Sequence, residues 1–172
     1  MKPIEQEIID FADDFFFHLS HNQLKERWDE FGKRQKDLHY FITTLKGSLE
    51  DQSQGDNYYR LFLILDHCYL KANLNLRFIK QDVIYKQLDW QDEMVSKAVN
   101  SSLKGKVEVS LTELTNAIGG MEQDDLMYYF QEKIKSYQVL EPKMSNADST
   151  QFFMTLMTMG FLYQKELLKQ MN

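Results

Sequence analysis

Two arginine–histidine pairs are the residues whose types and spacing could support catalysis. Arg60 and His67 lie seven positions apart, and Arg34 and His39 lie five apart. An arginine can stabilise a negatively charged phosphate while a histidine transfers a proton. On a helix, Arg60 and His67 are separated by about 20° around the axis, whereas Arg34 and His39 are about 140° apart. Therefore only Arg60 and His67 could contact the same substrate within a single chain.

The spacing of Arg60 and His67 resembles that of HEPN ribonucleases, which are small helical proteins that cut RNA. The resemblance implies RNA cleavage with Arg60 and His67 as the catalytic residues. Leu61 stands where that family usually has a polar residue. Because paired ionisable residues are often structural, we favour the interpretation that both side chains line a contact between helices. RNA cleavage is kept as the enzymatic alternative.

Metal chemistry lacks a suitable ligand pattern. His18 and His21 follow Asp13 and Asp14 closely, but the chain contains no Glu-x-x-His pair and no Cys-x-x-Cys pair. Zinc and di-iron sites need several such ligands converging from different helices. Asp10, Asp13 and Asp14 are expected to face water. We therefore predict no metal and no cofactor.

Residues 110–138 offer a second alternative. The segment from Glu113 to Gly119 resembles the first helix and turn of a helix-turn-helix, with Leu126 and Phe130 as the buried side of a second helix. Gly120 lengthens the turn by one residue. The second helix would begin with acidic residues, which repel phosphate. We favour a helix pair packed in the core and keep DNA binding as the alternative.

Composition restricts the class of protein. The chain has 172 residues, a formal net charge of −6 and one cysteine, Cys68. Its longest uncharged run, 149–164, is shorter than the roughly 20 residues of a membrane span. The amino-terminal segment carries acids where a signal peptide is apolar. We expect a single domain over 1–172, with a softer boundary near 100–110, in the cytoplasm and without membrane association.

The same apolar spacing occurs twice, and it predicts the architecture. Steps of three and four residues place side chains on one stripe of a helix. The first run is Leu24, Trp28, Phe31, Gln35, Leu38, Ile42, Leu45 and Leu49. The second run is Tyr58, Phe62, Leu65, Tyr69, Ala72, Leu76, Ile79 and Val83. We predict an all-α bundle of five to seven helices around a long antiparallel hairpin of helices at about 22–50 and 57–88.

The two arms of this hairpin differ. The second carries apolar residues on nearly every side, so it is expected to be the buried axis. In the first arm, Gln35 is the single polar residue of the stripe. We interpret it as a device that fixes register, so that its replacement by leucine should stabilise the fold.

No catalytic pattern stands out, and apolar helical surface is abundant. We therefore favour a non-catalytic interaction or regulatory protein that binds a protein partner or a second copy of itself. Expected partner-binding residues are Phe17, Tyr40, Met154, Met157 and Phe161. The last three belong to a methionine-rich helix, and methionine surfaces adapt to different partners. The alternative is that this helix fills the groove opposite the hairpin, and we favour this second interpretation.

Overall fold

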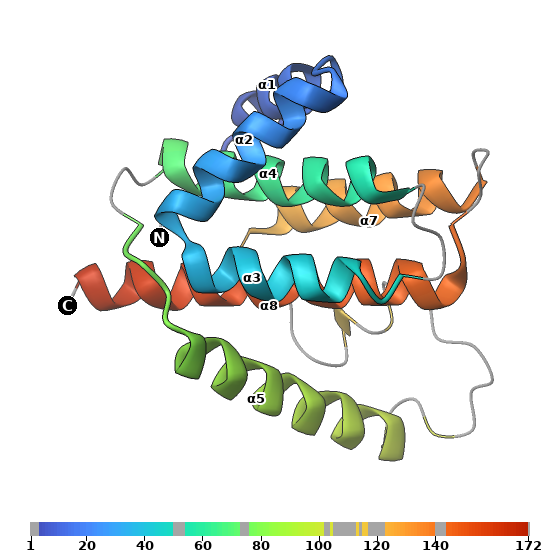
Figure 1. Cartoon of the computed structure of the whole chain (residues 1–172). Coiled ribbons are helices and arrows are strands. Elements are labelled where there is room, and N and C mark those ends of the chain that lie inside the picture. Colours follow the sequence, from blue (N-terminus) through green and yellow to red (C-terminus); the bar gives the residue numbers. More distant parts are fainter. Residues whose placement is uncertain are drawn as a thin grey trace.

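The computed structural model describes residues 4–49, 54–72, 76–101, 104, 113, 115–116, 123–139 and 144–171. These residues form seven helices and no strand, which confirms the predicted all-α bundle (Figure 1). The helices are α1 (Gln6–Phe17), α2 (His21–Arg34), α3 (Lys36–Lys46), α4 (Gly55–Ala72), α5 (Gln81–Asn100), α7 (Asp124–Val139) and α8 (Asn146–Met171). None of these helices combines the length and apolar character needed to cross a membrane.

Helix α4 is the axis of the bundle, as its apolar composition predicts. It packs against α1, α2 and α8. Its buried residues come from all sides of the helix and include Tyr58, Leu61, Phe62, Leu63, Ile64, Leu65, Cys68 and Tyr69. A helix with apolar residues around its whole circumference must be covered on several faces.

The predicted first arm, 22–50, is not one helix. Helix α2 ends at Arg34, Gln35 has φ −130° and ψ 58°, and α3 begins at Lys36. At this corner a Cβ placed on Gly32 would lie 2.9 Å from the His39 ring, so a larger residue there would force that ring to move. Helix α2 then crosses α4, while α3 runs in front of α8 (Figure 1). The stripe correctly identifies the buried residues, but not the continuity of the helix.

The predicted second arm, 57–88, is also interrupted. Helix α4 ends at Ala72, residues 76–80 are not helical, and α5 begins at Gln81. Helix α5 packs against α8 and α3 rather than extending α4 (Figure 1). Its start is fixed by Asp37, whose Oδ2 accepts the Gln81 backbone N–H at 2.9 Å. A carboxylate at this position stabilises the free N–H groups of a helix start.

Helix α8 covers the second side of α4 and also packs against α5 and α7. Its large buried apolar residues are Phe152, Phe153, Leu156, Met157, Met159, Leu162, Tyr163 and Leu167. Helix α8 therefore fills the groove beside the central helix α4, in agreement with the interpretation that we favour from the sequence. Most of residues 100–110, where we expected a softer boundary, lie outside the described residues.

Candidate functional site

The outer surface of α1 carries an unusual concentration of exposed aromatic side chains. Phe11 is 57% exposed, Phe15 36% and Phe17 65%, although the helix has only 12 residues. The rings of Phe11 and Phe15 are stacked, with centroids 6.1 Å apart. Large apolar side chains clustered on a surface commonly mark an interaction site.

Acidic side chains share this outer surface. Glu7, Asp10 and Asp14 are exposed, and at about 100° per residue they project between Phe17 on one side and the Phe11–Phe15 pair on the other. Residues 4–19 contain five acids and no lysine or arginine. We call Glu7, Asp10, Phe11, Asp14, Phe15 and Phe17 the α1 face.

Asp13 is the exception among the acids of α1. Its Oδ1 accepts the Tyr129 hydroxyl hydrogen bond at 2.9 Å, and its Oδ2 lies 2.7 Å from Lys133 Nζ. Both partners belong to α7. The expectation that Asp13 faces water is therefore wrong, because the α1–α7 contact covers its side of the helix.

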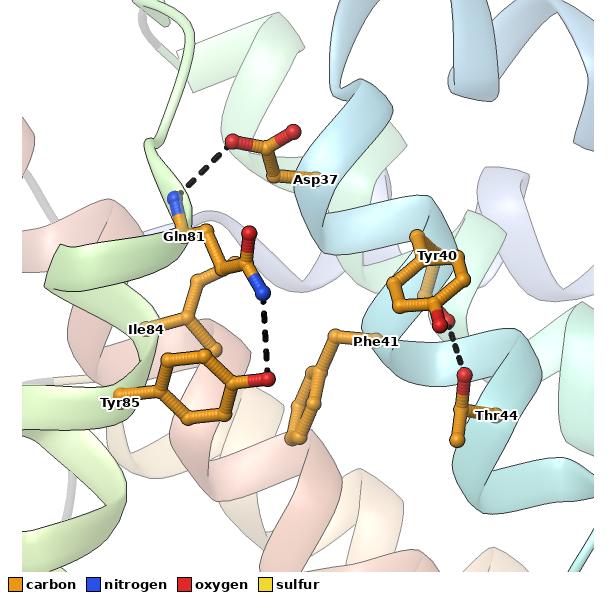
Figure 2. Close-up of a pocket in the computed structure, with 7 residues that line it drawn as sticks. All are labelled: Asp37, Tyr40, Phe41, Thr44, Gln81, Ile84 and Tyr85. Atoms are coloured by element: carbon orange, nitrogen blue, oxygen red, sulfur yellow. Dashed lines mark hydrogen bonds between the residues drawn. The ribbon is translucent and has the colours of Figure 1, made fainter.

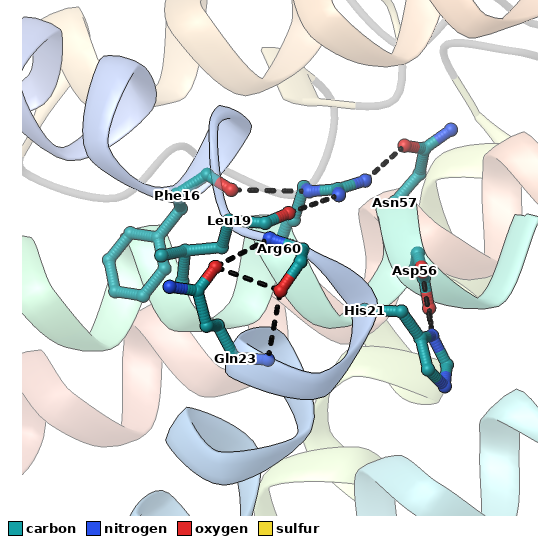
Figure 3. Close-up of polar contacts among 8 residues, drawn as sticks. Phe16, Leu19, His21, Gln23, Asp56, Asn57 and Arg60 are labelled. Carbon is teal, nitrogen blue, oxygen red and sulfur yellow. Dashed lines mark hydrogen bonds and ion pairs between the residues drawn. The ribbon is translucent and has the colours of Figure 1, made fainter.

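Arg60 binds the carboxyl-terminal end of α1. Its Nε donates to the Phe16 carbonyl at 3.2 Å, and its Nη2 donates to the Leu19 carbonyl at 3.1 Å (Figure 3). Nη1 donates to Asn57 Oδ1 at 3.4 Å. The last carbonyls of a helix lack partners within the helix, and a guanidinium satisfies them well. Arg60 thus holds the end of α1 against α4.

The next helix starts from the same corner. Ser20 and Gln23 form a reciprocal capping box at the start of α2. His21 Nδ1 lies 3.0 Å from Asp56 Oδ1, which ties α2 to the start of α4 (Figure 3). Together with Arg60, these contacts fix the orientation of α1 relative to the bundle.

His67, on α4, packs against the inner side of Phe11 in the α1 face. Its ring centroid lies 5.8 Å from that of Phe11, with the two planes inclined by 30°, and 5.8 Å from that of Phe16, with the planes at 79°. Burial lowers the pKa of His67, the Lys71 charge lowers it further, and Asp66 partly opposes both effects. A neutral imidazole fits between aromatic rings. Arg60 and His67 therefore both line the α1–α4 contact, as the favoured interpretation of the pair predicts.

The other pair, Arg34 and His39, is separated by the α2–α3 corner. Arg34 Nη2 lies 2.6 Å from the buried carboxylate of Asp66, which also accepts the Tyr163 hydroxyl hydrogen bond at 2.6 Å. The His39 ring lies 4.9 Å from the Trp28 ring, and burial lowers its pKa. The two side chains serve different contacts.

The expected partner-binding residues fall into two groups. Phe17 and Tyr40 are well exposed, at 65% and 66%. Met157 is fully buried, and Met154 and Phe161 are partly buried against the core, with Phe161 5.4 Å from Trp90. These three side chains contribute to the interior packing of α8. Phe11 and Phe15, whose spacing places them on the apolar side of the first helix, are exposed.

Residues 110–138 are described only in part. Leu126 and Phe130 are buried in α7, as predicted, and Asp124 and Asp125 are exposed at its start. Residues 117–122, where the sequence predicts the turn, lie outside the described residues. Within the part of the chain that the structure describes, no three histidine, cysteine or acidic side chains are grouped as a metal site.

Comparisons with models of known protein families, with curated proteins and with solved structures find no match to this chain.

Proposed function

We propose that this chain is a non-catalytic, cytoplasmic interaction protein of regulatory type, and that it binds a partner protein through the α1 face. The observation that carries the proposal is the exposure of three phenylalanines on one short helix. Exposing such side chains to water costs free energy that a partner could recover by covering them.

The acids of the α1 face indicate the chemistry of the partner. A complementary surface would place apolar side chains on Phe11 and Phe15 and lysine or arginine opposite Glu7, Asp10 and Asp14. An amphipathic basic helix has this pattern, with apolar anchors at helical spacing. Opposite charges would accelerate encounter and select the partner, so binding should weaken as salt rises.

A second copy of the chain fits this face poorly. In a two-fold symmetric contact the same patch meets itself. The three outer acids of one α1 would then lie opposite the same three acids of the other, and like charges across an interface oppose association. We therefore propose that the partner is a different protein, rather than a second copy of the chain bound through α1.

The positioning of the face supports this role. Arg60 holds the end of α1, and His67 lies beneath Phe11. The Arg27 guanidinium lies 5.9 Å from the Phe15 ring centroid, so that ring also has a neighbour that restrains it. Side chains already held in place lose less entropy on binding.

Affinity purification from the native cell tests the proposal. The wild-type chain, the double variant Phe11→Ser/Phe15→Ser and the control Tyr128→Ser would be compared, since Tyr128 is an aromatic residue on α7 that is 66% exposed. We expect a stoichiometric partner with the wild type and the control, and its loss with the double variant at unchanged helicity. Recovery of the same partner by the double variant, or the absence of any stoichiometric partner with the wild type, would overturn the proposal.

A further inference from the structure

A small aromatic groove lies between α3 and α5 (Figure 2). Helix α5 lies on the side of the bundle away from α1 (Figure 1). Tyr40 from α3 and Tyr85 from α5 line it and are 66% and 52% exposed. Phe41 also lines the groove, and the buried side chain of Ile84 lies at its base. The groove therefore combines three aromatic rings with an apolar base.

Asp37 adds a negative charge at one end of the groove. Its Oδ2 accepts the Gln81 backbone N–H at 2.9 Å, and the Gln81 side-chain amide donates to the Tyr85 hydroxyl at 3.2 Å (Figure 2). These bonds fix the carboxylate and the Tyr85 ring relative to each other. The second carboxylate oxygen, Oδ1, has no hydrogen-bond partner among the described residues.

No cationic side chain is among those that line the groove. Elsewhere the chain pairs its cations with rings: Lys46 lies 6.0 Å from Tyr59, and Lys165 lies 5.4 Å from Trp90. Among the described residues, Tyr40, Phe41 and Tyr85 have no such cation. Their electron-rich faces and the nearby carboxylate are complementary to a positive charge carried by an apolar group.

We propose that this groove binds an alkylammonium group on an apolar stem, the chemistry of a lysine side chain and of its methylated forms. The stem would lie over Ile84 and Phe41, and the ammonium would lie between the tyrosine rings and Asp37. A methylated ammonium is favoured by the rings because it is weakly hydrated, whereas a primary ammonium depends more on the carboxylate. The site is separate from the α1 face, so either proposal can fail alone.

An NMR titration of the full-length protein tests the site. The probes are the N-acetyl amides of trimethyllysine, lysine and norleucine, where norleucine keeps the apolar stem without the charge. We expect shifts confined to residues of α3 and α5 with one or both cationic probes, and none with norleucine at about 10 mM, a concentration that would reveal millimolar affinity. Equal shifts with norleucine, or no shifts with either cationic probe, would overturn the proposal.

Matched variants separate the contributions of rings and charge. Tyr40→Leu and Tyr85→Leu should each weaken binding about threefold or more, whereas Tyr40→Phe keeps the ring and should preserve it. Asp37→Asn retains an acceptor for the Gln81 N–H, removes the charge and should weaken binding of the lysine probe. Tyr128→Leu, on α7, should change nothing. Binding that survives both leucine substitutions would contradict the assignment to this groove.

Discussion

Gln35 binds the backbone of Arg77 and Ile79, on either side of Phe78. Its Nε2 donates to the Arg77 carbonyl at 2.9 Å, and its Oε1 accepts the Ile79 N–H at 3.0 Å. Gln35 is buried at the corner between α2 and α3. These two hydrogen bonds from the side-chain amide hold residues 76–80 against this corner. One side chain therefore joins the two points at which the predicted long helices are interrupted.

Replacing Gln35 with leucine should destabilise the protein. Leucine cannot bind either backbone group and would leave the buried Ile79 N–H without its partner. We expect a loss of about 1–3 kcal/mol in the free energy of unfolding, measured by urea denaturation. This reverses the expectation from the apolar stripe, in which leucine stabilises the fold. Faster amide hydrogen exchange at Ile79 in the variant would locate the effect, and a more stable variant would refute the role of the clamp.

Arg60 should be required for stability. Arg60→Ala removes the donors to the Phe16 and Leu19 carbonyls, and we expect a loss of about 1–3 kcal/mol by thermal or urea unfolding. Arg60→Lys should recover only part of it, because one ammonium lacks the planar fork that spans both carbonyls.

An RNA cleavage assay tests the enzymatic alternative. If Arg60 and His67 were catalytic, the wild type would cut RNA and each alanine variant would lose that activity while remaining folded. We expect no cleavage by the wild type. An activity abolished by His67→Ala at unchanged stability would favour the HEPN-like interpretation instead.

Alkaline pH should destabilise the fold through its buried tyrosines. Burial raises the pKa of Tyr137 to about 12, and burial raises the pKa of Tyr58, Tyr129 and Tyr163 well above the ordinary value. A group with a raised folded-state pKa holds its proton more tightly in the folded protein. Its stabilisation is complete below the unfolded pKa of about 10 and is lost as pH rises towards the folded value.

Two measurements check this prediction. The free energy of unfolding, measured with urea, should not change through tyrosine ionisation up to about pH 9. It should fall steadily above about pH 10. Absorbance at 295 nm should show that part of the nine tyrosines ionises only when the protein unfolds. Tyr163→Phe should reduce the slope above pH 10. Complete ionisation near the ordinary pKa without unfolding would contradict the buried environments.

Cys68 should be unreactive in the folded protein. It is fully buried in α4, and burial raises the pKa of its thiol to about 12. Since the thiolate is the reactive species, a disulfide reagent such as DTNB should label Cys68 only when the protein opens. Labelling should therefore become rapid at the urea concentrations that unfold the chain. Immediate labelling under native conditions would show that the α4 environment is more accessible than described.

Apolar periodicity identified the buried faces but not the ends of the helices. Leu24, Phe31, Leu38 and Ile42 are buried as the stripe predicts. The break at Gln35 follows from its bonds to residues 42 and 44 positions away, and no local spacing encodes such partners. The stripe continues in phase across the break, so periodicity alone indicates one helix.

The candidate site was predictable only in part for a similar reason. Phe17 and Tyr40 lie on otherwise polar sides of their helices, which correctly indicated exposure. Phe11 and Phe15 belong to the apolar side of α1, and their exposure depends on how far α4 and α7 reach around that helix. The apolar side of α1 is wider than the part of the helix that α4 and α7 cover. This difference can be seen only in the packed structure.

Site-specific photo-crosslinking tests the binding role of the α1 face most directly. A benzoylphenylalanine would replace Phe11 in one variant, Phe17 in a second and Tyr128 in a control, each expressed in the native cell. We predict one protein crosslinked from positions 11 and 17 and absent from position 128, with a basic amphipathic segment at the crosslinked site. A partner that crosslinks from position 128 but from neither position on α1 would contradict the account.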